Sequence, residues 1–101
     1  MTAFVISEFT ILDEALTARY RELAEASIAR YGGRYVVRGE VIEALEGVWP
    51  PEQRLVVVEF PSLDRAREWY GSPEYARALE VRGQALARRL ILIDAGDAVP
   101  G

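Results

Sequence analysis

The stretch LVVVEFPS at residues 55–62 predicts one central strand of the fold and the point where that strand ends. Its β-branched and aromatic residues favour a strand, and the run is apolar enough for a strand with a neighbour on each side. Pro61 ends the strand, because proline lacks the backbone N–H that a sheet ladder needs. Ser62 is a good N-cap, so we expect a short helix over residues 63–70 that ends at Gly71.

Toward the N-terminus, the pattern predicts a strand, a helix and a second strand. Residues 3–9 are rich in strand-forming residues, and the acidic pair at 13–14 stands where the dipole of a following helix favours negative charge. Apolar residues at helical spacing predict one buried helix face, and Arg21 falls outside it. The glycine pair at 32–33 ends this helix, and residues 34–38 form the second strand.

Toward the C-terminus, the pattern predicts a loop, a helix and a last strand. Residues 39–45 could extend the second strand after a glycine bend, whereas GVWPPE at residues 47–52 is typical of a rigid, proline-held hairpin loop. SPE at residues 72–74 has the order of cap, first-turn proline and early acid, so a helix should run from there to about Ala87. Residues 89–94 form the fourth strand.

The predicted order β-α-β-β-α-β is that of a single ferredoxin-like α+β domain over residues 1–96, with a flexible tail at 97–101. Right-handed crossovers place both helical layers on one face of a four-stranded antiparallel sheet. The other face would expose valine, leucine and isoleucine side chains to water. We therefore expect a second copy of the chain to cover that face and form a homodimer.

Composition excludes several classes of partner and chemistry. Half of the 101 residues are apolar and 28% are charged, as in an ordinary globular domain. The 16 acidic residues outnumber the 12 basic ones and leave a net charge of −4, so no nucleic-acid partner is expected. All 12 basic residues are arginine, which excludes Schiff-base chemistry on lysine.

The chain contains no cysteine and no histidine. Their absence excludes disulfides, thiolate nucleophiles and triads built on either residue, and we expect no metal and no cofactor. The first residues lack the pattern of a signal peptide, and no apolar run approaches the roughly 20 residues that cross a bilayer. The sequence therefore predicts a cytoplasmic protein without a membrane partner.

Several short motifs occur in an order that resembles one known family. They are YGGRY at 31–35, VRG at 37–39, LEG at 45–47, Trp49, VEFPS at 58–62, WY at 69–70, SPEY at 72–75 and Arg82. Together they resemble the family of domain of unknown function 1330 over about residues 3–95. The resemblance implies a dimeric α/β-barrel, two ferredoxin-like subunits packed sheet to sheet, in a superfamily with cofactor-free monooxygenases, isomerases and heme-degrading enzymes. It implies no established activity.

Two glutamates are candidate catalytic residues. Alternation places Glu8 and Glu59 on one face of the first and third strands, which we take as parallel neighbours. The two carboxylates would then meet at the C-terminal ends of these strands, beside Arg34. Such a pair with a nearby cation can act as a general acid or base. The same groups can instead form an ion-pair network that only holds the dimer in register.

A second set of candidates concerns ligand binding. Arg82 falls on the apolar stripe of the last predicted helix, where it could clamp a ligand carboxylate or phosphate. It could instead pair internally with Glu8 or Glu59, or pack its stem while its charged head reaches water. The other candidate ligand-binding residues are Arg34, Arg38, Tyr35, Trp69, Tyr70 and Tyr75. Aromatic residues at helical spacing are also typical of a core.

The leading functional hypothesis is a protein that binds a small hydrophobic or aromatic carboxylic acid, or a cofactor-independent enzyme, with its pocket between sheet and helices. The alternative is a non-catalytic dimeric accessory or regulatory module. The residues identify neither a reaction nor a substrate.

Overall fold

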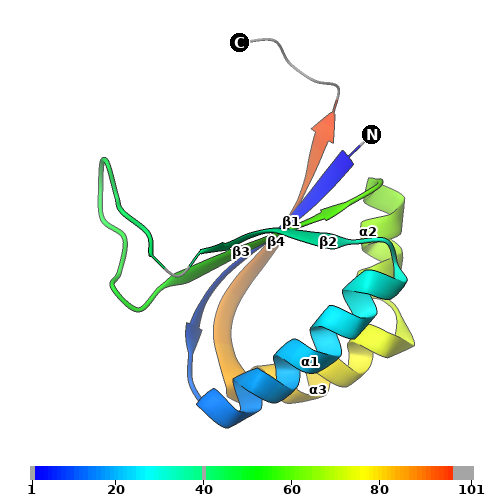
Figure 1. The fold of residues 1–101 in the computed structure, drawn as a ribbon, viewed down its shortest axis with the longest axis horizontal. Helices are drawn as coiled ribbons and strands as arrows, with labels where there is room; N and C mark the ends of the chain where they lie inside the picture. The colour runs from blue at the N-terminus through cyan, green and yellow to red at the C-terminus, as the bar shows by residue number, and fades with distance from the viewer. Residues whose placement is uncertain (1, 40, 97–101) are drawn as a thin grey trace.

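A computed structural model describes residues 2–39 and 41–96, and Figure 1 shows the path of the chain. The elements follow in the order β1 (Thr2–Ile11), α1 (Glu14–Arg30), β2 (Arg34–Gly39), β3 (Arg54–Phe60), α2 (Leu63–Tyr70), α3 (Pro73–Ala85) and β4 (Leu86–Gly96). This order confirms the predicted ferredoxin-like α+β fold, with α2 and α3 as its second helical segment. The predicted tail at 97–101 lies outside the described residues.

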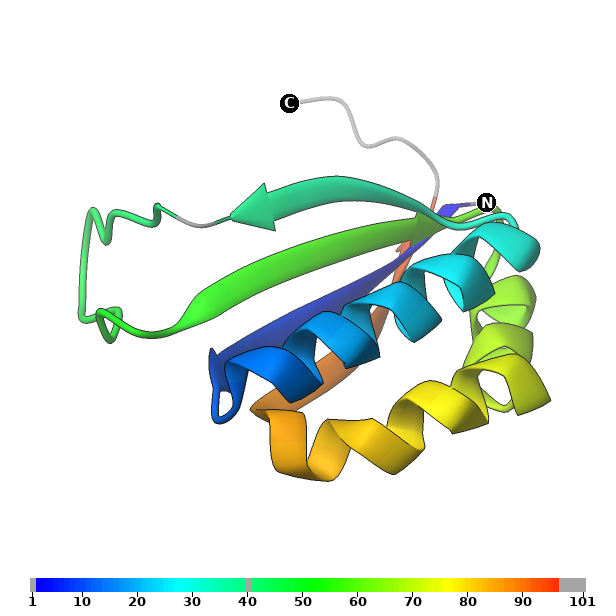
Figure 2. The ribbon, with the colours of Figure 1, turned by 60° about the horizontal axis from the view of Figure 1, so that its bottom comes forward.

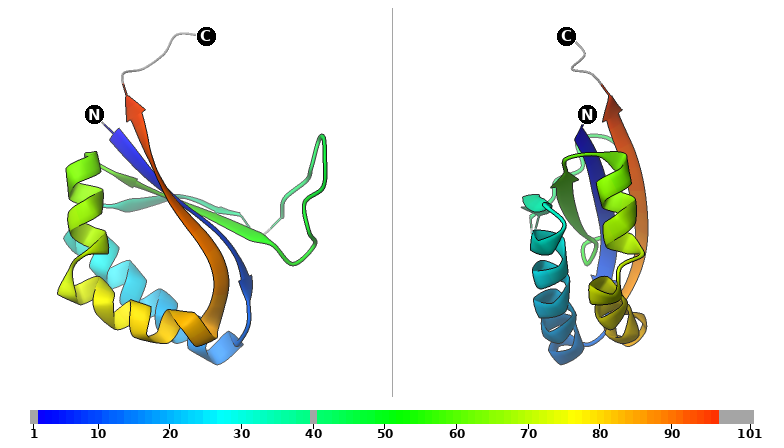
Figure 3. Two further views of the ribbon diagram at one scale, coloured as in Figure 1. Left: turned by 180° about the vertical axis from the view of Figure 1, so that it is seen from behind. Right: turned by 90° about the vertical axis from the view of Figure 1, so that its right-hand side faces the viewer.

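The four strands form one sheet in the order β2-β3-β1-β4, and every neighbouring pair is antiparallel. The three helices lie on one face of the sheet, where α1 and α3 run side by side (Figure 2). Figure 3 shows the start of β1 beside the end of β4, where Thr2 pairs with Gly96. We call the helix-facing side, with Val5 and Phe9, the inner face and the opposite side, with Ile6, the outer face.

Local sequence explains where the helices begin and end. The side chain of Asp13 caps α1 by accepting a hydrogen bond from the backbone of Leu16 at 2.9 Å, and Gly32 follows the helix with a φ of 79°. Ser62 and Ser72 cap α2 and α3 in the same way, as predicted. None of the described helices is both long and apolar enough to cross a membrane.

The core fills the space between the inner face and the helices. Its buried residues include Ala3 and Val5 of β1, Val58 and Phe60 of β3, Ala24 and Ile28 of α1, Trp69 of α2, and Tyr75 and Ala78 of α3. A side chain at Gly33 would lie within 2.7 Å of both Ile28 and Phe60, so the turn after α1 needs a glycine for close packing.

The structure corrects the predicted relation between β1 and β3. These strands are antiparallel, with Phe4 opposite Glu59 and Leu55 opposite Glu8. The physical reason is the connection through α1, which places β2 parallel to β1 and leaves a gap that β3 fills after reversing direction. Glu8 and Glu59 therefore stand at opposite ends of the sheet, and the predicted cluster of both with Arg34 does not form.

Three predicted boundaries also change. β2 ends at Gly39, and the described residues 41–53 form a loop that extends away from the helices (Figure 1). α3 ends at Ala85 rather than near Ala87, because Leu86 is already extended, with φ of −138° and ψ of 144°, and buries its side chain at 3% exposure. β4 then continues to Gly96, beyond the predicted end of the strand.

Candidate functional site

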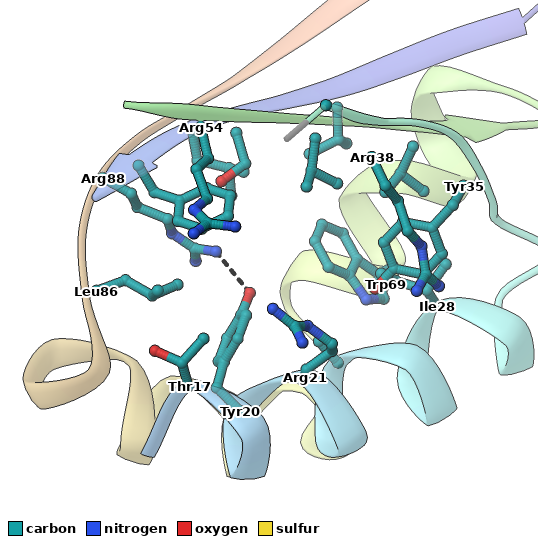
Figure 4. Close-up of a pocket in the computed structure, with 18 residues that line it drawn as sticks. Thr17, Tyr20, Arg21, Ile28, Tyr35, Arg38, Arg54, Trp69, Leu86 and Arg88 are labelled. Carbon is teal, nitrogen blue, oxygen red and sulfur yellow. Dashed lines mark hydrogen bonds between the residues drawn. The ribbon is translucent and has the colours of Figure 1, made fainter. Parts of the chain in front are cut away.

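A cavity of about 160 Å³ lies between the inner face of the sheet and α1 (Figure 4). All four strands and α1 line it, and Trp69 of α2 joins them. The apolar lining includes Ile28, Val58 and Trp69, and Figure 4 shows Ile28 and Trp69 beside Tyr35 and Arg38, at the end away from Arg54 and Arg88. The polar lining consists of Ser7, Thr17, Tyr20, Tyr35, Arg21, Arg38, Arg54 and Arg88.

Strand register brings two of these arginines together at one end of the cavity. Phe9 of β1 pairs with Arg54 of β3 on one side and with Arg88 of β4 on the other. Neighbouring strands are about 4.8 Å apart, so the two arginine backbones lie about 10 Å apart across Phe9. Figure 4 shows their side chains entering from the sheet, while Arg21 enters from α1 below.

The cavity lining contains four arginines, and the described residues compensate their charges to very different degrees. Arg38 pairs with Glu25 at 2.9 Å and stacks over the ring of Tyr35 at 3.9 Å. Arg88 is held only by tyrosine hydroxyls. Arg21 and Arg54 make no ion pair or hydrogen bond with any described residue, and no Asp or Glu of the described chain lines the cavity. The lining is therefore strongly electropositive.

Arg88 joins Tyr20, which also lines the cavity, and Tyr75, which lies behind the lining, in a small network. Its guanidinium donates to the hydroxyls of Tyr20 and, at 2.7 Å, of Tyr75, and the two hydroxyl oxygens are 2.6 Å apart. Burial and the nearby Tyr20 hydroxyl raise the pKa of Tyr75 far above its usual range. Burial alone would lower the pKa of Arg88, but the two phenol oxygens outweigh it and raise that pKa. Arg88 therefore stays charged and Tyr75 neutral.

Aromatic rings gather near the end of the cavity that holds Trp69. The ring of Trp69 packs against that of Tyr75 with centroids 4.2 Å apart and planes inclined by 40°, and the indole N–H of Trp69 donates to the Ser27 hydroxyl at 3.0 Å. Desolvation by burial, together with the charge of Glu25, raises the pKa of Tyr35 to about 12. Of these rings, Trp69 and Tyr35 line the cavity and can contact a ligand.

The structure brings together only some of the predicted site residues. Arg38, Tyr35 and Trp69 line the cavity. Tyr75 does not line it but is hydrogen-bonded to two residues that do, Tyr20 and Arg88. Predicted residues outside the lining are Tyr70, Arg82, Arg34, Glu8 and Glu59.

Three of those residues sit on the outer face in ion pairs. Arg34 donates to Glu59 at 2.7 Å, and Glu8 accepts from Arg89. Arg82 makes neither predicted internal pair, and its Nε is buried without a hydrogen-bond partner in the described part of the chain. An anion clamp at Arg82 finds no support in the shape of the cavity.

Sequence reasoning missed four polar residues of the cavity lining, namely Tyr20, Arg21, Arg54 and Arg88. A signal existed for Arg54 and Arg88, because each extends the inner-face alternation of a strand by one step, before Val56 and before Leu90. Each predicted strand began one residue too late to include its arginine, whereas β3 begins at Arg54 and β4 at Leu86. Among the described residues, no cluster of acidic side chains is placed to hold a metal ion.

Solved structures share this fold at low sequence identity. A protein of unknown function from Rhodopseudomonas palustris matches with a TM-score of 0.79 and 19% identity, over 96% of this chain and 84% of its own. SnoaB from Streptomyces nogalater, a cofactor-independent oxygenase, matches with a TM-score of 0.69 and 15% identity, over 99% and 98%. A dimeric protein of unknown function with a ferredoxin-like fold from Bacteroides fragilis gives 0.61 and 16%, over 92% and 95%.

No curated protein is significantly similar to this chain in sequence. The three structural likenesses establish the fold alone, because their identities are so low. One family model, described as domain of unknown function (DUF1330), matches residues 2–96, which is nearly the whole chain. The chain therefore belongs to the DUF1330 family, as its motifs predicted.

Proposed function

We propose that this protein is a homodimer that binds a small planar hydrophobic carboxylate in the cavity between its sheet and α1. The observation that carries the proposal is the lining of arginines without carboxylates, in which Arg21, Arg54 and Arg88 have no acidic partner among the described residues. Arg54 and Arg88 are half-buried, and cations withdrawn from water in this way are normally paired, whereas Arg21 is exposed. A bound anion would supply the missing partner.

Arginine favours a carboxylate because its planar fork donates two parallel hydrogen bonds to the two oxygens. The opposite end of the cavity, with Trp69 and Ile28, would hold the carbon skeleton of the same ligand. A cavity of about 150 Å³ holds one benzene ring. The volume of about 160 Å³ therefore fits a single-ring acid such as benzoate.

The alternative is a non-catalytic module in which the charges serve only the fold. That reading suits the outer face, where Glu8 and Glu59 each pair with an arginine. It does not account for the cavity, where Arg21 and Arg54 contact no acidic group of the described chain. A cofactor-independent enzyme acting on the bound acid is compatible with the same site, and SnoaB, whose fold is similar, is an oxygenase of that kind.

The outer face supports the homodimer. A row of apolar residues crosses all four strands in register, consisting of Val37, Val57, Ile6 and Ile91. Val37 and Ile91 at its ends are 42% and 43% exposed in the single chain. A second copy would remove this row from water, and the similar Bacteroides fragilis protein is dimeric.

Titration with benzoate tests the proposed binding, with the fluorescence of Trp69 as the signal. A Trp49→Phe background removes the loop tryptophan, which lies outside the cavity. We expect binding at micromolar to low-millimolar concentration, weakened at least tenfold, or about 1.4 kcal/mol, by Arg54→Met or Arg88→Met.

Arg77→Met is the matched control, since Arg77 also lacks an ion pair or hydrogen bond to the described residues but lies outside the cavity. It should leave the affinity unchanged. Absence of binding across a panel of single-ring and two-ring aromatic acids would show that the proposal is wrong.

A further inference from the structure

The hydrogen-bond network around Arg88 determines where the proton of one tyrosine points. Tyr75 is fully buried, at 0% exposure, so its hydroxyl hydrogen needs a partner inside the protein. Within the described part of the chain its hydroxyl is hydrogen-bonded to Arg88 and Tyr20, and a guanidinium has no acceptor. The hydrogen of Tyr75 must therefore be donated to the Tyr20 oxygen, 2.6 Å away.

This assignment leaves the hydroxyl hydrogen of Tyr20 free. The oxygen of Tyr20 accepts from Tyr75 and from Arg88, so both of its acceptor positions are used. Tyr20 lines the cavity, whereas Tyr75 does not. Figure 4 shows the Tyr20 ring rising from α1 with its oxygen directed to the cavity and to Arg88. The hydroxyl hydrogen of Tyr20 therefore points into the cavity.

We propose that Tyr20 is an oxyanion donor, and that the cavity binds planar weak acids, such as phenols and enols, in their ionised form. The inference rests on the proposed function, because it uses the same cavity, and it extends the ligand class from carboxylates to groups that are neutral in water near pH 7. A hydroxyl whose oxygen accepts from a cation is a polarised donor, and such a donor binds an anionic oxygen more strongly than a neutral one.

The arginine charges of the cavity also favour the ionised form of a bound weak acid. Burial of a phenol favours its neutral form, but an opposite charge within about 4–6 Å lowers the pKa of an acid by about 1–3 units. Arg88 donates to the oxygen of Tyr20, Figure 4 shows Arg54 entering beside Arg88 from the sheet, and Arg21 belongs to the same helix as Tyr20. No Asp, Glu or His among the described lining residues can take the proton, which would leave to solvent through the mouth of the cavity.

The probe is 4-nitrophenol, because its phenolate is yellow and its phenol is not. Titration of the bound probe with pH should show an apparent pKa at least one unit below that of the free probe, which means that the phenolate binds at least tenfold more tightly than the phenol. Tyr20→Phe should remove most of this preference, while benzoate binding falls less because the arginines remain.

Two further tyrosine variants separate a donor from a mere packing residue. Tyr75→Phe keeps the Tyr20 hydroxyl but removes the hydrogen bond that polarises it, so the bound probe should show an intermediate pKa. Tyr70→Phe, in a ring outside the cavity lining, should leave the pKa of the probe as in the wild type.

The outcomes distinguish this inference from the proposed function. If benzoate binds but bound 4-nitrophenol titrates at or above its free pKa, the oxyanion inference is wrong and the proposed function stands. The same conclusion follows if Tyr20→Phe and Tyr70→Phe behave alike. If neither probe binds, the proposed function is wrong and the inference falls with it.

Discussion

The two faces of the sheet carry arginines in opposite ways. On the outer face, Arg34 pairs with Glu59 and Arg89 pairs with Glu8, at opposite corners of an apolar row. On the inner face, Arg54 and Arg88 flank Phe9 without any carboxylate of the described chain. The same strands and the same alternation of side chains therefore build one face with balanced charge and one with excess positive charge.

Under the proposed function, this difference separates charges that stabilise the fold from charges that bind a ligand. A paired charge at the rim of an apolar surface remains satisfied whether or not anything binds there. An unpaired cation in a half-enclosed cavity keeps its water until an anion replaces it, so its free energy depends on the ligand. The inner face is accordingly where we place binding, and the outer face is where we place assembly.

A charged residue in the apolar row of the outer face should have the largest effect, because we propose that this row forms the dimer interface. Ile91→Glu puts a carboxylate in the apolar row of the outer face, where a second copy would bury it without a partner. We expect light scattering to change from about twice the 11.3 kDa chain mass to the mass of one chain, with the dimer dissociation constant raised at least a hundredfold. Ala18→Glu, on the exposed side of α1, should leave the mass unchanged.

A wild-type protein that is monomeric at micromolar concentration would contradict this assignment of the outer face. So would an Ile91→Glu variant that remains a dimer.

A carboxylate on the inner face should give its arginines an acidic partner, as the arginines of the outer face already have. Arg54→Glu places an acid two strands from Arg88, so that the protein supplies its own counter-ion. We expect benzoate affinity to fall at least a hundredfold, while the free energy of unfolding without ligand changes by less than about 1 kcal/mol. Arg54→Met should weaken binding less. Retained binding in Arg54→Glu would mean that the ligand does not use this end of the cavity.

High pH should destabilise the protein through the inner face. The pKa of Tyr35 is raised to about 12 by burial, above its ordinary value of 10.0, and that of Tyr75 is raised further. A raised folded-state pKa contributes no penalty below pH 10 and costs stability as pH rises from 10 through 12, because the unfolded chain releases the proton first. The loss from Tyr35 should be on the order of 2 kcal/mol by pH 12.

Urea unfolding between pH 9 and about 12 measures this loss, and Tyr35→Phe and Tyr75→Phe should each lessen it. Tyr70→Phe, with its half-exposed ring, serves as the comparison. Equal alkaline sensitivity in all three variants would show that these buried hydroxyls do not govern it.

The smallest effect is expected at the outer-face ion pair. The side chain of Arg34 is 72% exposed, so its pairing with Glu59 is largely solvated. Glu59→Gln should lower the free energy of unfolding by less than about 1 kcal/mol, as measured by chemical denaturation. It should also leave benzoate affinity unchanged, since Glu59 lies outside the cavity. A tenfold loss of binding in this variant would restore Glu59 as a candidate site residue.

Local sequence determined the elements and the face of each strand residue. Ser62 and Ser72 cap their helices as predicted, and Asp13 caps α1 in the same way, because a cap depends on a side chain and on a backbone N–H only three residues ahead. Val58 lies on the inner face and Glu59 on the outer face for an equally local reason, the alternation of side chains along a strand. The excess of acidic residues and the lack of histidine are likewise properties of the sequence alone.

Only the tertiary structure decided which of these residues meet. Arg54 and Arg88 are far apart in the sequence and come together because β1 inserts between their strands. Glu8 and Glu59 were expected together and lie apart for the same reason, since strand order and direction depend on long-range connections rather than on neighbouring residues. Tyr20 and Arg21 line the cavity because of how α1 is rotated about its axis when it packs on α3 and the sheet. The spacing of apolar residues along the helix does not determine this rotation closely enough to predict it.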